Sequence, residues 1–290
     1  MRAWARRNAL AWSYAPLRLA RAFMRPLGLS SSRRLRVLYY HDVAPEDRER
    51  FASQLRWLGR TWNFITPERF AAMVSGQEPI RGSHLLLTFD DGFASHRAVA
   101  EQVLNPMRIR ALFFAMSDLV AIADRMEARR FMAQLYPAAR TGALPEHWSN
   151  MGWADLEALL EQGHTVGAHT CTHPRLSRLE SIEELEKEIV ASGDALERRL
   201  GVPIEHFAWT YGDLASISQT ALAVARRRYR FVHSGLRGDN AANVSPGALR
   251  RDAASAQDPR AVLGALLEGA TDFRDARARA QLDAWNLLVP

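Results

Sequence analysis

The chain has 290 residues, 48% of them hydrophobic and 24% charged, a composition that excludes collagen-like, coiled-coil and wholly disordered proteins. It contains no run of about 18 apolar residues, so no membrane-spanning helix is predicted, and its single cysteine, Cys171, excludes an internal disulfide. The net charge is +6, from 38 basic and 32 acidic residues. Nine of the basic residues lie in residues 1–36, which contain no acidic residue, so residues 37–290 contain 29 basic and 32 acidic residues. The positive charge belongs to the N-terminal segment, and we predict no nucleic-acid binding.

Strand and helix patterns alternate along the chain after a polar linker that ends at Arg34. Strands are predicted at 35–40, 64–65, 84–89, 111–116, 164–168, 207–209 and 231–232, and helices at about 46–59, from 66 onward, at about 94–105, 153–162, 180–200, up to 228, and at about 259–269 and 272–287. Residues 124–150 are polar and Arg-rich and are predicted to form an irregular insertion over one end of the fold. The alternation predicts an α/β fold with a mostly parallel sheet, in which reactive side chains collect where strands end.

The first such strand end is Thr88-Phe89-Asp90-Asp91-Gly92, where two carboxylates follow a continuous apolar run. Neighbouring carboxylates repel each other unless a cation holds one of them, and the ionised partner is then free to act as a base. Asp-Gly is also a common turn dipeptide. Taken alone, the motif is more often a turn than a site.

The second strand end is His169-Thr170-Cys171-Thr172-His173-Pro174. Histidines four residues apart reach one metal ion when the segment is helical or tightly turned, although most isolated pairs of this kind arise by coincidence. We interpret Cys171 as a buried small hydrophobic residue rather than a ligand. A third segment, Phe207-Ala208-Trp209-Thr210-Tyr211-Gly212-Asp213, alone predicts a strand followed by a tight turn. Together the three segments supply the Asp, His and His of an open catalytic metal site, with a spare carboxylate beside it.

From Val37 to Arg251 the sequence resembles the polysaccharide deacetylases of the NodB-homology type, carbohydrate esterase family four. The motifs that carry the resemblance are T-F-D-D-G, then W-x-D-L-x-x-L-x-x-x-G-H-x-V-G-x-H-T-x-T-H-P, then F-A-x-x-Y-G-D, in the family's order and spacing. The resemblance implies a distorted (β/α) barrel that removes acetyl groups from N-acetylated saccharides with a divalent metal ion, most often Zn²⁺. It implies that Asp91, His169 and His173 are the metal ligands and that Asp90 is the general base.

The resemblance further implies that the backbone N–H of Tyr211 stabilises the oxyanion and that Arg251 orients the base. The family usually has proline before this tyrosine, where the chain has Thr210, so the turn is expected to be less rigid. The family's proton-donating histidine usually comes from a late strand. Here a Y-H-x-V opening on the first predicted strand resembles the branch in which that strand is shifted to the front, so His41 is the candidate general acid and His233 the alternative.

On this interpretation residues 35–290 form the catalytic domain, with the insertion at about 124–150 and a helical C-terminal tail at about 256–290. Two other functions stay open at this stage. One is a metal amidohydrolase that acts on a small formamide, acetamide or cyclic imide. The other is a non-catalytic carbohydrate-binding relative, although such a protein has no physical reason to keep a base beside three metal ligands.

The N-terminal segment, residues 1–34, has a helical pattern of its own. Wound at about 100° per residue, residues 2–25 place Trp4, Trp12, Leu19 and Phe23 within a sector of roughly 100°, and the six arginines of this stretch fall outside it. An apolar stripe opposite a cationic face is typical of a helix that lies in a membrane interface. We therefore predict peripheral attachment to the cytoplasmic leaflet.

Three other interpretations of the segment stay open. A disordered basic tail is the simplest of them. A secretory signal is disfavoured by its short apolar core, although Ala20-Arg21-Ala22 resembles a cleavage site and leaves export open. An Arg-rich, acid-free amphipathic helix also resembles an organellar transit peptide. The lone cysteine fits a reducing compartment, and the predicted location is cytoplasmic.

Overall fold

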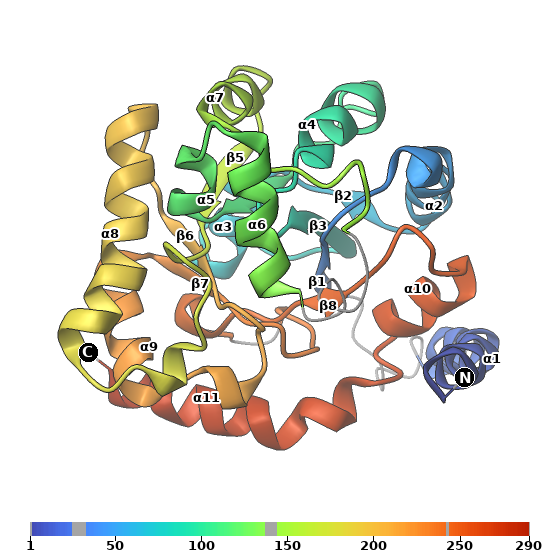
Figure 1. Ribbon diagram of the computed structural model, residues 1–290. Helices are drawn as coiled ribbons and strands as arrows, with labels where there is room; N and C mark the ends of the chain where they lie inside the picture. Colours follow the sequence, from blue (N-terminus) through green and yellow to red (C-terminus); the bar gives the residue numbers. More distant parts are fainter. Residues whose placement is uncertain (1, 25–32, 137–143, 242–243, 290) are drawn as a thin grey trace.

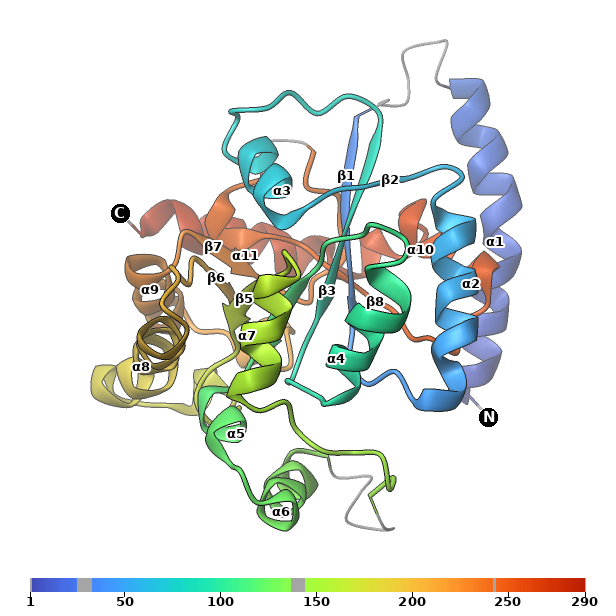
Figure 2. The same ribbon diagram turned by 90° about the horizontal axis from the view of Figure 1, so that it is seen from above.

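The computed structural model describes residues 2–24, 33–136, 144–241 and 244–289. The described strands form one parallel sheet in the order β7-β6-β5-β4-β3-β1-β8, with β2 also paired to β3. Helices surround this sheet (Figures 1 and 2), which confirms the distorted (β/α) barrel. No helix in the described part of the chain is both long and apolar enough to cross a membrane.

The strands are β1 (Arg34–Tyr40), β2 (Asn63–Phe64), β3 (Ser83–Phe89), β4 (Leu112–Ala115), β5 (Thr165–Ala168), β6 (His206–Ala208), β7 (Phe231–His233) and β8 (Asp252–Ala253). The α-helices are α1 (Arg2–Met24), α2 (Arg48–Leu58), α3 (Pro67–Val74), α4 (Ser95–Val99), α5 (Ser117–Ala121), α6 (Arg125–Leu135), α7 (Trp153–Glu161), α8 (Ile182–Leu200), α9 (Gln219–Arg228), α10 (Arg260–Leu267) and α11 (Ala276–Leu288). The predicted helix at 94–105 widens from α4 into a π-helical turn, η2 (Ala100–Leu104).

The register of the sheet brings the strand ends to one level. Tyr40 pairs with Phe89 across β1 and β3, and Ala115 pairs with Ala168 across β4 and β5. The Asp90 backbone N–H donates to the Tyr40 carbonyl at 2.9 Å. Because the strands are parallel, the residues that follow β1, β3 and β5 all lie at the same end of the sheet, the carboxyl end of its strands.

A short segment that we did not predict as a strand joins the two edges of the sheet. Leu249 forms a parallel bridge with His233 at the end of β7, and three residues later β8 pairs with β1. The Ala254 backbone N–H donates to the Tyr39 carbonyl at 2.9 Å. This segment narrows the gap between the sheet edges and carries Arg251 into the interior.

The prediction of an irregular insertion at 124–150 is wrong for residues 125–135, which form α6. The Asp124 side chain caps this helix by accepting from the Glu127 backbone N–H at 2.7 Å. The Arg129 guanidinium donates to the carbonyls of Leu144, Pro145 and Trp148, which ties the returning chain to α6. An arginine of this Arg-rich stretch therefore binds backbone carbonyls. Residues 137–143 lie outside the described part of the chain.

The N-terminal segment forms α1, which continues through Pro16 to Met24. It lies along the outside of α10 and α2 (Figures 1 and 2). The linker residues 25–32 and the side chain of Trp4 lie outside the description.

The arginine run at the end of α9 makes ion pairs with acidic residues of α8, such as Arg228 with Asp194 at 2.7 Å, as expected for a solvated helix end.

Candidate metal centre and active site

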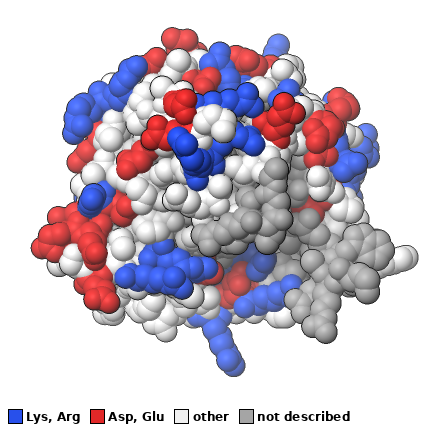
Figure 3. All heavy atoms as spheres, viewed as in Figure 1, with Lys and Arg blue, Asp and Glu red and all other residues white. Residues whose placement is uncertain are grey.

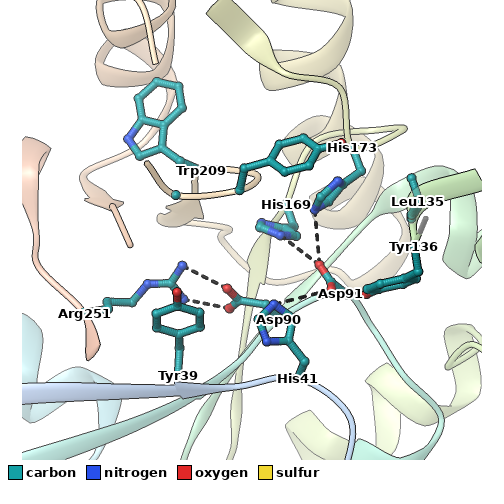
Figure 4. A pocket seen from close by; sticks show the side chains of 12 residues that line it. Tyr39, His41, Asp90, Asp91, Leu135, Tyr136, His169, His173, Trp209 and Arg251 are labelled. Carbon is teal, nitrogen blue, oxygen red and sulfur yellow. Dashed lines mark hydrogen bonds and ion pairs between the residues drawn. The ribbon is translucent and has the colours of Figure 1, made fainter. Parts of the chain in front are cut away.

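The predicted site residues meet where the parallel strands end (Figure 4). Asp90 and Asp91 follow β3, His169 follows β5, and His41 follows β1. They line one cavity of about 210 Å³, together with His173, Tyr211 and Arg251. The cavity is also lined by Tyr39, Leu135, Tyr136, Trp209 and Gly212. This space is large enough for a small acyl group.

The backbone around the cavity is strained. Asp91, Thr170, His173 and Tyr211 have φ angles of 76°, 65°, 67° and 61°. Residues other than glycine rarely adopt this left-handed conformation, and it persists where the surrounding structure enforces it, most often at functional sites. Of the five non-glycine residues with positive φ in the described part of the chain, four thus lie in the two loops or the turn that form the site.

Three ligand atoms converge on one point, and all three are acceptors when both imidazoles carry their proton on Nδ1. The His169 Nδ1–H donates to the Ala208 carbonyl at 2.9 Å, so in the neutral ring Nε2 is an acceptor, and it faces Asp91 Oδ1 at 3.1 Å. His173 Nε2 lies 3.4 Å from the same oxygen, which is buried and has no hydrogen-bond donor. Acceptors this close repel each other unless a cation lies between them.

The donor set therefore fits a divalent ion. One oxygen and two imidazole nitrogens, all within 4.8 Å of one another, form the only such group among the described residues. The hydrogen bond from His169 to Ala208 fixes the tautomer and ring orientation, as a second-shell partner does in metal sites. Cys171 is buried, with its thiol directed at the Lys187 carbonyl at 3.2 Å, and lies outside the group.

Asp90 is clamped rather than free. The Arg251 guanidinium forms two parallel hydrogen bonds with its carboxylate, at 2.7 and 2.9 Å, and also binds the Ser234 carbonyl and the Thr88 hydroxyl. Burial raises the pKa of Asp90, but the charge and hydrogen bonds of Arg251, together with the charges of His169 and His41, hold the pKa below its ordinary value. The carboxylate therefore stays ionised with a fixed orientation.

The structure separates the two candidate general acids. The His41 side chain lines the cavity, is 48% exposed, and its Nε2 lies 3.7 Å from Asp91 Oδ2. His233 is fully buried, does not line the cavity, and its Nε2 lies 3.0 Å from His206 Nδ1. Burial lowers the pKa of His233 well below its ordinary value, so this ring is neutral and unavailable as the alternative acid.

The turn that carries Tyr211 is held by a hydrogen bond in place of the family's proline. The buried Thr210 hydroxyl donates to the Pro174 carbonyl at 2.6 Å, which links this turn to the loop of His173. Gly212, which follows Tyr211, has φ +71°, and a Cβ there would lie 2.8 Å from the Gly235 backbone. The expected loss of rigidity is offset by this link between the two loops.

Sequence reasoning missed Tyr136, which follows α6. Its hydroxyl donates to Asp91 Oδ2, because burial and the nearby carboxylate raise its pKa well above the ordinary value and keep it protonated. Its ring contacts Trp148 edge-on, with the ring centroids 4.9 Å apart. Tyr39 and Trp209, which also line the cavity, were not predicted either. A tyrosine in a polar insertion carries no local pattern that points to a site.

Charge around the site is mixed. The face shown in Figure 3, viewed as in Figure 1, has acidic and basic side chains scattered around its rim. The charges that decide the chemistry are the buried ones, Asp90, Asp91 and Arg251.

Comparisons with known proteins agree with this geometry. Residues 77–229 match the family model described as polysaccharide deacetylase. A comparison with curated protein sequences finds no match. The structure of IcaB from Ammonifex degensii is similar, with 24% identity and a TM-score of 0.62 over 81% of this chain and 97% of that one.

Two further structures share the fold. The BpsB deacetylase domain from Bordetella bronchiseptica is 19% identical, with a TM-score of 0.62 over 78% of this chain and 97% of that one. The Streptococcus pyogenes deacetylase PplD, in complex with acetate, is 20% identical, with a TM-score of 0.61 over 80% of this chain and 97% of that one. The family match spans more than half of the 290 residues, and we conclude that the chain belongs to the polysaccharide deacetylase family, hydrolases that remove acetyl groups from N-acetylated carbohydrates.

Proposed function

We propose that this chain hydrolyses the acetamido group of an N-acetylated saccharide with a divalent ion, Zn²⁺ in the native protein, held by Asp91, His169 and His173. The observation that supports this most is the convergence of three acceptor atoms on one point beside a separately clamped carboxylate. A bound ion polarises the amide carbonyl and lowers the pKa of water.

The chain's own groups supply the proton transfers. Asp90 accepts a proton from the attacking water, and Arg251 keeps its carboxylate ionised and oriented. His41, which lines the cavity from the end of the neighbouring strand β1, donates a proton to the departing amine. The Tyr211 backbone N–H donates to the oxygen that gains negative charge.

The cavity fits the acetyl end of such a substrate. Leu135, Tyr136 and Trp209 supply an apolar wall for its methyl group, and the volume of about 210 Å³ leaves the rest of a longer saccharide outside. With the acetamido group inside, the other sugar units can contact the surface around the cavity, which a simple acetamide does not reach. We propose that the partner is a polymer or lipid-linked saccharide rather than a free small amide.

Metal analysis tests the ligand set. We expect about one divalent ion per chain, and most of it lost in His169→Ala. His84→Ala is the matched control, because His84 is buried at the opposite end of β3, and it should keep the metal. Full metal content in His169→Ala would overturn the assignment.

Acetate release tests the substrate class. The metal-loaded protein should release acetate from N-acetylglucosamine oligomers with a higher kcat/KM than from simple acetamides. A preference for the simple amides would instead identify a small-molecule amidohydrolase. Binding of the oligomers without any acetate release would identify a carbohydrate-binding protein.

A further inference from the structure

Helix α1 has an inner face that is bound to the rest of the molecule. The Tyr14 ring packs edge-on against Trp57 of α2, with the ring centroids 5.6 Å apart, and it lies against Gly264 of α10, where a Cβ would come within 2.5 Å of it. Arg21 Nε forms an ion pair with Glu268 at 2.8 Å, just after α10. These contacts hold the helix in one orientation on the molecule.

The opposite face of α1 carries bulky apolar side chains in water. Trp12, Leu19 and Phe23 are 84%, 60% and 75% exposed. Their spacings of seven and four residues place them in one stripe, about half a turn away from Tyr14 and Arg21. Single exposed apolar residues are ordinary, but an apolar stripe on a helix whose other face is already packed marks an interaction surface.

The chemistry of this stripe matches a lipid surface. Tryptophan and phenylalanine beside arginine are typical of helices that lie in the interfacial region of a bilayer, and residues 2–24 hold five arginines and no acid. Arg18 is exposed and lies about a third of a turn from the stripe, where its guanidinium donates to the Tyr14 hydroxyl at 3.1 Å. This charge complements anionic headgroups. We propose that α1 inserts Trp12, Leu19 and Phe23 into the headgroup region of an anionic bilayer and thereby holds the enzyme on the membrane surface.

The proposal fits the position of the pocket. Figure 2 shows α1 alongside α2, on the side of the barrel, with its axis running roughly along β1. The cavity lies at the carboxyl end of the strands. A bilayer beneath α1 therefore lies beside the barrel wall and leaves the mouth of the cavity open.

Vesicle co-sedimentation of the full chain tests the apolar contact. We expect the wild-type protein to bind phosphatidylcholine vesicles that contain phosphatidylglycerol. The partition coefficient should fall at least tenfold in the triple variant Trp12→Gln, Leu19→Gln, Phe23→Gln. The three side chains are exposed, so the thermal unfolding temperature and the acetate release from soluble substrates should stay unchanged.

A second triple variant is the matched control. Ile182→Gln, Leu287→Gln and Leu288→Gln remove three side chains that are 50%, 85% and 69% exposed on α8 and α11, far from α1 in Figure 1. Binding should stay at the wild-type level in this variant. An equal loss in both triple variants would overturn the proposal.

The charge contribution is tested with Arg18→Gln. Near an anionic surface one arginine is worth about fivefold in binding, so this variant should bind the anionic vesicles about fivefold more weakly and show a weaker salt dependence. If the wild-type protein does not bind the anionic vesicles, the proposal is overturned. Equal binding of the wild-type protein and the α1 triple variant would also overturn it. So would lipid-free dimerisation that the same triple variant abolishes, because it would assign the stripe to a second copy of the chain.

Discussion

At the scale of single residues, Asp90 is distinguished from Asp91 by its partner. Arg251 occupies both Asp90 oxygens, whereas Asp91 Oδ1 faces two histidine nitrogens. Asp90→Asn should therefore keep its metal yet lose activity by about 10²–10⁴-fold, the effect of removing a proton-transfer group. Elemental analysis and acetate release on the same preparation check this. Near-normal turnover would contradict the role as base, and parallel loss of metal would make Asp90 a ligand.

His41 is tested by the nature of the leaving group. An amine must be protonated to depart, whereas the phenolate of an activated aryl acetate leaves with little help. His41→Ala should therefore reduce acetate release from an N-acetylated sugar by about 10²-fold or more and affect an aryl acetate much less. The ratio of the two kcat/KM values is the measurement. Equal losses on both substrates would indicate a binding role.

At the scale of elements, Asp42 connects the end of β1 to the chain that returns from α6. Its Oδ2 accepts from His147 Nε2 at 2.7 Å and from Trp148 Nε1 at 2.8 Å. The Trp148 ring also packs edge-on against Phe93, with the ring centroids 5.1 Å apart. One carboxylate therefore holds this returning segment against the strand end that carries His41.

Removing that carboxylate should loosen the returning segment. Asp42→Ala leaves two donors without an acceptor, at about 1–3 kcal/mol for each that stays buried. We expect faster hydrogen exchange and proteolysis between residues 144 and 150, with little change in the sheet. Glu127→Ala, an exposed change on α6, should leave both rates at their wild-type values. Unchanged exchange in Asp42→Ala would contradict the role of this carboxylate in holding the segment.

At the scale of the whole molecule, buried histidines make stability depend on pH. Burial lowers the pKa of His96, His164 and His206 to about 4, and lowers that of His233 well below its ordinary value. Between pH 6.5 and 4 these histidines are protonated in the unfolded chain but stay neutral in the folded chain. The free energy of unfolding therefore falls as the pH falls. Asp252 acts in the opposite direction, because burial raises its pKa to about 7, but the histidines outnumber it.

Urea unfolding across this pH range measures the effect. Each buried histidine contributes up to about 1.4 kcal/mol per pH unit to the slope of the unfolding free energy. His164→Gln should reduce the slope by about one such contribution, whatever its effect on stability at neutral pH. A free energy of unfolding that stays flat from pH 6.5 to 4 would contradict the account.

Much of the fold was predictable because its signals are local. Apolar runs such as 84–89 and helix signals such as Thr66-Pro67, where the Thr66 hydroxyl caps α3, depend on neighbours along the chain. The elements that were not predicted are either too short for a periodic pattern or have the composition of a loop. β8 has two residues, too few for a periodic pattern, and α6 is polar on most of its surface, so its composition resembled a loop.

The sequence alone determined the order of strands and helices and the strand ends at which Asp90, Asp91, His169 and His173 lie, because parallel strands release their carboxyl ends on one side. Only the tertiary structure decided that Tyr136 reaches Asp91, that His233 pairs with His206 away from the cavity, and which face of α1 is covered. Tyr136 and Asp91 are 45 residues apart in the sequence. Such contacts depend on how whole elements pack, and no local periodicity encodes that packing.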